Sequence, residues 1–155
     1  MADITFELLK RKDFEETYRL CQKVFGDSPC VEKVFDVFMK CEDDPHYRLI
    51  VGKVDGKVVA YTTMVLFHNV FDGPYPIATL WYVCVDKEHR RQGIASAMFK
   101  EIERIAREEH CEIIYFTSLK DNLSAHEFYR TAGYDDAAEK AFVKYLYKEW
   151  SADDY

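Results

Sequence analysis

Two neighbouring arginines followed by small residues form the segment of this sequence that is best suited to chemistry. Residues 90–95 read Arg-Arg-Gln-Gly-Ile-Ala, at the start of an expected helix. A helix start presents unpaired N–H groups and the positive end of the helix dipole, which together favour an anion. Gly93 and Ala95 would let a phosphate approach the backbone, and Arg90 and Arg91 add positive charge to a chain of net charge −7. These residues predict a phosphate site, although an ordinary helix start with solvated arginines is the alternative.

Residues 90–95 and a second motif at residues 122–134 both resemble the motifs of one protein family. Arg90-x-x-Gly93-x-Ala95 resembles the (R/Q)-x-x-G-x-(G/A) pattern of the GNAT superfamily of N-acetyltransferases, and it lies between an expected strand and a long helix. Residues 122–134 resemble the family's N-x-x-A-x-x-F-Y block with its following G-(F/Y). The two matches together cover about residues 77–134. The resemblance implies acetyl-coenzyme A as cosubstrate, no metal, and transfer of acetyl to a primary amine.

The resemblance also assigns the residues that hold the cofactor. Backbone N–H groups at the helix start would bind the pyrophosphate, main-chain groups of the preceding strand would pair with the pantetheine arm, and Asn122 would bind that arm too. A backbone N–H near the strand could polarise the thioester carbonyl. The implied cofactor-binding residues are Val83, Cys84, Val85, Arg90, Arg91, Gln92, Gly93, Ile94, Ala95, Ser96, Asn122, Ala125 and Phe128.

Tyr129 stands at the family position of the general acid. Attack of a neutral amine on a thioester expels a thiolate, and a tyrosine hydroxyl close to the sulfur can protonate it. Thiols and tyrosines have ordinary pKa values of about 8.5 and 10, and the tyrosine hydroxyl could alternatively hydrogen-bond the departing thiolate. From residue type alone, Tyr129 would instead be a core aromatic residue.

The general base is not evident. Histone-type members of the family carry a glutamate on the central strand, and Thr79 occupies that position here. A water chain to backbone carbonyls could serve, as could the side chains of His68, Asp72, Glu112 or His126.

The family frames its acceptor pocket with the first two helices and the turn before the central strand. In this sequence those segments are residues 25–34 and 68–76, which combine aromatic side chains with Asp27, Glu32 and Asp72. Such a pocket would suit a cation, but ordinary core residues and solvated acids would give the same pattern.

The elements expected to position these residues follow the order β-α-α-β-β-β-α-β-α-β. Apolar spacing predicts a helix from Asp13, which with Glu16 could form a capping box, and Asp55-Gly56 predicts a tight hairpin. Further strands are expected at residues 77–85, 111–118 and 142–147. The fold class is therefore α/β, with a mixed, mostly antiparallel sheet of six to seven strands and about four helices in one domain, residues 1–155.

Composition excludes several functions. The charge of −7 disfavours nucleic acid as a partner, and no apolar run is long enough for a membrane span. We expect a cytoplasmic protein because no signal peptide is visible and the five cysteines lack metal-ligand or disulfide-framework spacing. The resemblance allows a homodimer but shows no interface.

Three hypotheses follow. The first is an N-acetyltransferase acting on a small-molecule or peptide amine by direct attack in a ternary complex. The second is a non-catalytic acyl-coenzyme A binding or sensing module, favoured by the missing strand carboxylate. The third is an anion-binding α/β domain unrelated to coenzyme A.

Overall fold

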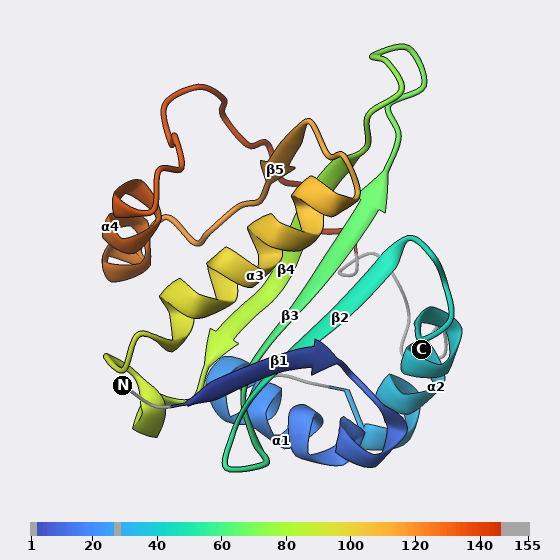
Figure 1. Cartoon of the computed structure of the whole chain (residues 1–155), viewed down its shortest axis with the longest axis vertical. Coiled ribbons are helices and arrows are strands. Elements are labelled where there is room, and N and C mark those ends of the chain that lie inside the picture. Colours follow the sequence, from blue (N-terminus) through green and yellow to red (C-terminus); the bar gives the residue numbers. More distant parts are fainter. Residues whose placement is uncertain (1–2, 27–28, 147–155) are drawn as a thin grey trace. The chain divides into compact units, whose positions relative to one another are not determined.

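Five strands form one sheet in the computed structural model, which describes residues 3–26 and 29–146 (Figure 1). Their spatial order is also their order in the chain, and neighbouring strands are antiparallel except for β4 and β5, which are parallel. The strands are β1 (Ile4–Leu8), β2 (Tyr47–Val54), β3 (Lys57–Phe67), β4 (Ile77–Val85) and β5 (Ile113–Tyr115). The chain divides after Phe116 into two units, and each is described by itself below.

The first unit contains three α-helices: α1 (Phe14–Phe25), α2 (Val31–Cys41) and α3 (Ile94–Glu108). In Figure 1, α3 lies across one face of the sheet, and α1 lies against the opposite face. The inner side of α3 is fully buried at Ile94, Met98 and Ile102, which recur every four residues as an amphipathic helix requires. The GNAT-type α/β architecture expected from the sequence is confirmed, with five strands rather than six to seven in the described residues.

Local turn chemistry explains several element boundaries. Asp55 and Gly56 both have positive φ, 50° and 77°, as a two-residue hairpin turn between β2 and β3 requires. At the end of α1, Gly26 has a φ of 87°, and its N–H donates to the carbonyl of Gln22 at 2.9 Å. Both features match the sequence-based prediction.

The predicted capping box at the start of α1 is wrong. Asp13 makes no side-chain cap, because its carboxylate pairs instead with the buried Lys53 Nζ on β2 at 2.8 Å. Glu7 on β1 is a second partner of the same ammonium group. Glu16 accepts a hydrogen bond from the N–H of Val58 at 3.2 Å. The carboxylate of Asp13 therefore binds the buried Lys53 instead of capping the helix, and the resulting ion cluster holds α1 against the sheet.

Two predicted strands differ from the structure. The strand expected at residues 111–118 is reduced to β5, which pairs with β4 at three positions. Residues 142–146 form no strand, and Phe142 is 91% exposed; residue 147 lies outside the described residues. A strand needs a partner edge as well as an apolar pattern, so the pattern alone overestimated the sheet.

The second unit contains α4 (Leu123–Thr131). Gly133, two residues after the helix, has a φ of 95°. It carries the second motif noted in the sequence. Extension of one domain across residues 1–155 stays a prediction.

Candidate active site

The edge of β4 that faces β5 is open for most of its length. Pairing with β5 ends at Thr79 and Tyr115, whereas β4 continues to Val85. Among the described residues, no strand pairs with this edge of β4 between residues 80 and 85. Unpaired backbone groups of this kind can receive an extended ligand as an added strand.

The backbone groups directed to this open edge can be assigned from the neighbouring hydrogen bonds. The N–H of Asp86 donates to Val59 of β3 at 2.8 Å. Successive residues of a regular strand direct their N–H and C=O groups to opposite sides, so those of Val85 point away from β3. Cys84 lies opposite Tyr61 of β3 and belongs to the paired side. The backbone of Val85 is therefore directed to the open edge, and the predicted cofactor-binding roles of Val83 and Val85 stay predictions.

A β-bulge interrupts β4 immediately before these residues. Tyr61 pairs with Cys84 and Thr63 with Trp81, so Tyr82 and Val83 together face the single residue Thr62. Tyr82 has a φ of 56°, which is unusual for a bulky residue. The hydroxyl of Thr62 donates to the carbonyl of Trp81 at 3.1 Å and ties the bulge to β3. Sequence reasoning missed this bulge, since no glycine marks it.

The start of α3 has the features of an anion site. Gly93 adopts a left-handed conformation with φ 77° and ψ 6°, makes no side-chain cap, and precedes a first turn without acidic residues. Arg91 also has a positive φ of 60°. Arg90, Arg91, Gln92 and Ser96 are exposed, Ala95 is half-buried, and Ile94 is buried in the core. The first turn of α3 brings no carboxylate to compete for its backbone amides, and two arginines precede it in the chain, so the residues fit a pyrophosphate.

The loop between β4 and α3 is fastened to α1. Asp86 accepts hydrogen bonds from Lys23 Nζ at 2.9 Å and from the N–H of Glu88 at 3.3 Å. Burial opposes the charged form of Asp86, but these two bonds hold its pKa below the ordinary value. The short 3-10 turn at Lys87–His89 is thereby held in place ahead of the helix start.

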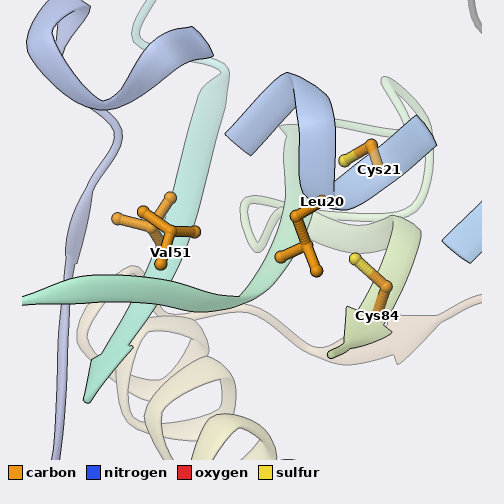
Figure 2. Close-up of a cluster of buried hydrophobic side chains, with 5 residues drawn as sticks. Leu20, Cys21, Val51 and Cys84 are labelled. Carbon is orange, nitrogen blue, oxygen red and sulfur yellow. The ribbon is translucent and has the colours of Figure 1, made fainter. Parts of the chain in front are cut away.

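Two buried thiols connect α1 with β4. Cys21 and Cys84 face one another in a core cluster with Leu20, Val51 and Val58 (Figure 2). The hydrogen bond with Cys21 and burial together raise the pKa of the Cys84 thiol, so this thiol stays protonated. Cys84 therefore contributes to the site through its position on β4 and not as a nucleophile.

The residues of the second motif lie on α4. Asn122 is exposed and makes no side-chain cap, while Ala125, Phe128 and Tyr129 are half-buried. The rings of Phe128 and Tyr129 pack edge to face with centroids 5.6 Å apart. Burial raises the pKa of Tyr129, which keeps its hydroxyl protonated at neutral pH.

An apolar cavity of about 350 Å³ lies between α1, α2 and the sheet. Its wall includes Val34 and Pro29 from the first predicted acceptor segment, but no residue of 68–76. None of its described lining residues is charged. This cavity is therefore not the acidic pocket expected from residues 25–34 and 68–76, which stays a prediction, and Asp27 lies outside the described residues. The aromatic lining residues are Phe14, Tyr18, Phe38, Tyr47, Tyr61 and Tyr82.

Three candidate bases lie at the opposite end of β4 from the bulge. His68 and Asp72 belong to the connection that precedes Ile77, and Glu112 donates its backbone N–H to Pro76. Tyr82 lies five residue steps along β4 from Ile77, which corresponds to roughly 16 Å. Thr79 is paired with Val65 and Tyr115 and brings no carboxylate. On α4, the His126 ring lies 2.9 Å from the carbonyl of Leu119.

Comparison with known proteins places the chain in a family. Residues 11–134 match the model of the acetyltransferase (GNAT) family, and the chain belongs to that family. No helix in the described part of the chain has the length and apolar character to span a bilayer.

Solved structures share the fold at low sequence identity. A provisionally assigned acetyltransferase from Agrobacterium tumefaciens has a TM-score of 0.83 at 17% identity, over 91% of this chain and 99% of that one. An aminoglycoside acetyltransferase from an uncultured soil metagenomic sample, in complex with trehalose, has a TM-score of 0.74 at 21% identity, over 92% and 93%. Aminoglycoside N-acetyltransferase AAC(6')-Iy in complex with CoA has a TM-score of 0.79 at 13% identity, over 94% of this chain and 96% of that one.

Proposed function

We propose that this protein transfers an acetyl group from acetyl-coenzyme A to the primary amine of a small molecule or peptide. The observation that carries the proposal is the open edge of β4, which leads through a short loop to the uncapped start of α3 at Gly93. An extended amide-containing arm fits the first feature, and a pyrophosphate fits the second. A structural neighbour adds support, since aminoglycoside N-acetyltransferase AAC(6')-Iy was solved in complex with CoA.

The donor half of the reaction depends on backbone groups. Val83 and Val85 would pair with the pantetheine amides, and amides from Arg91 to Ser96 would hold the pyrophosphate between Arg90 and Arg91. The bulge at Tyr82 frees backbone from the β3 ladder, and an N–H there would stabilise the oxyanion that develops on the thioester carbonyl.

The chemical step needs one proton donor. The neutral amine attacks the thioester carbon, the C–N bond forms, and the C–S bond breaks to release coenzyme A thiolate. Tyr129 would give its hydroxyl proton to the departing sulfur, and the proton lost by the amine nitrogen returns to the solvent or to the phenolate. Asn122 would bind the pantetheine arm, and Ala125 and Phe128 would pack against it.

Two measurements test this function. Titration calorimetry with acetyl-coenzyme A should show one-to-one binding, and a thiol-release assay should show turnover with members of a broad amine panel. Binding without turnover for any amine would favour the acyl-coenzyme A sensing module. An absence of binding would overturn both functions and leave only an unrelated anion site.

A further inference from the structure

We propose that the cavity between α1, α2 and the sheet binds an uncharged, apolar part of the acceptor, so that the substrates are hydrophobic primary amines and not polycations. This inference rests on the proposed function and specifies its acceptor. The cavity has about 350 Å³, whereas about 150 Å³ suffices for benzene in an apolar protein cavity. An aryl or branched alkyl group larger than a single ring would therefore fit.

Four of the hydroxyl groups around the cavity already have partners within the protein. Tyr18 donates to the carbonyl of Pro29 at 2.9 Å, and Thr17 donates to the carbonyl of Asp13 at 2.8 Å. The hydroxyls of Tyr61 and Thr63 bond to each other at 2.7 Å. A ligand with many polar groups would lose its hydration here without gaining these partners, and that loss is costly.

Charge gives a second reason. No carboxylate lines the described wall of the cavity, so a polyamine or aminoglycoside would bury ammonium groups without a counterion. An amine at the edge of such a cavity is instead shifted toward its neutral form, because burial disfavours the charged form. The neutral form is the nucleophile, which reduces the need for the carboxylate that Thr79 replaces.

The cavity is also continuous with the donor site along the chain. Tyr82 lines the cavity and is the strained residue of the β4 bulge. The next residue in the chain, Val83, belongs to the same bulge, and Val85 beyond it lies on the open edge. We therefore expect an acceptor whose apolar part occupies the cavity to direct its amine toward this edge of β4.

The test compares 2-phenylethylamine with 1,4-diaminobutane and an aminoglycoside in the thiol-release assay. We expect kcat/KM to be about 10- to 100-fold higher for 2-phenylethylamine, because its ring is removed from water. A preference for either polycation would overturn the inference while leaving the acetyltransferase function intact.

A variant pair on α2 gives a matched control. Val37 lines the cavity and is 57% exposed, so Val37→Glu should fold and place a carboxylate at the wall. We expect it to lower kcat/KM for 2-phenylethylamine at least 10-fold and to raise that for 1,4-diaminobutane. Met39→Glu adds the same charge on the same helix outside the cavity and should change both values less than about twofold. Equal effects of the two variants would contradict the inference.

A binding measurement separates this inference from the proposed function. In the NMR spectrum, 2-phenylethanol, which has no amine to acetylate, should shift the methyl signals of Val34 and Leu49, both of which line the cavity. Absence of these shifts would overturn the cavity assignment whether or not acetyl-coenzyme A binds. Failure of acetyl-coenzyme A to bind would overturn the proposed function without affecting these shifts.

Discussion

The open edge of β4 and the apolar cavity are built in opposite ways. The edge and the start of α3 present backbone groups, whose positions depend on strand ends, a bulge and one left-handed glycine. The cavity presents side chains contributed by two helices and three strands. A backbone site tolerates variation in most side chains, whereas a side-chain site changes its specificity with each substitution. If the proposed sites are right, the donor is determined by the fold and the acceptor by the particular side chains of this chain.

The largest expected effect is on the turnover number and concerns Tyr129, the proposed proton donor to the departing thiolate. Tyr129→Phe should lower kcat by about 10²- to 10⁴-fold, the usual contribution of a general acid, with the affinity for acetyl-coenzyme A unchanged. Steady-state kinetics and calorimetry measure the two quantities. Tyr75→Phe, at an exposed position before β4, is the control. Wild-type turnover by Tyr129→Phe would remove this residue from the mechanism.

The next prediction tests the backbone character of the donor site. Gly93→Val places a β-branched residue at a φ of 77°, which costs about 1–3 kcal/mol and adds methyl groups where the pyrophosphate approaches. We expect acetyl-coenzyme A to bind about 100-fold more weakly in calorimetry. Gly26→Val creates the same kind of strain at a φ of 87°, where an added Cβ meets nothing within 4 Å. Similar losses of affinity in the two variants would show that strain alone is responsible.

A third prediction examines how the cavity wall is held. Lys53→Met leaves Asp13 buried without its cation, and breaking a buried pair of this kind costs about 3 kcal/mol. Chemical denaturation should show the loss, and the KM for the amine should rise more than that for acetyl-coenzyme A, because α1 lines the cavity. Lys10→Met removes an exposed partner 3.9 Å from Glu7 and should have little effect.

The same ion cluster predicts a pH dependence. The hydrogen bond from Lys53 lowers the pKa of Glu7 below its ordinary 4.5. The folded state therefore binds the proton of Glu7 less well than the unfolded state, and this stabilisation is complete above pH 4.5 and lost as the pH falls through the lowered value. Denaturation curves of the wild type should show this acid loss. A loss of equal size in Lys53→Met would contradict the assignment.

The smallest effect is expected where the two regions are joined. Lys23 on α1 binds Asp86 in the donor loop, and its side chain is 46% exposed. Exposed pairs contribute little, so Lys23→Met should weaken acetyl-coenzyme A binding only about twofold. Arg19→Met, which breaks an exposed pair with Glu15 on the same helix, should have no effect on this binding. A tenfold loss in Lys23→Met would mean that the two regions are coupled more strongly than their construction suggests.

The sequence predicted the parts of the fold that depend on local chemistry. The hairpin at Asp55-Gly56, the stop at Gly26 and the bounds of β4 were all predicted correctly, since each depends on residue type and short-range pattern. The strand at residues 142–147 was not, since strand formation depends on a partner. The cap at Asp13 was wrong because a lysine forty residues away along the chain competes for its carboxylate.

The same distinction applies to the site. The left-handed helix start at Gly93 could be predicted because it belongs to a local motif, and its role as an anion site stays a prediction. The cavity could not, since Tyr18, Val37 and Tyr61 come from different elements and only the folded chain brings them together. The bulge at Tyr82 had no sequence signal, because a tyrosine at positive φ is contrary to local preference and is imposed by the strands around it.

The reactivity of the facing thiols of Cys21 and Cys84 can report how fast α1 separates from the sheet. Both are buried, whereas Cys30 is exposed and Cys41 and Cys111 are half-buried. A maleimide should therefore label Cys30 first and reach the facing pair only when α1 separates from β4. Mass spectrometry of the digested protein identifies each labelled cysteine, and the labelling rate of Cys21 and Cys84 measures that opening. A ligand that occupies the cavity should slow this labelling, which gives a readout of cavity binding that needs no catalysis.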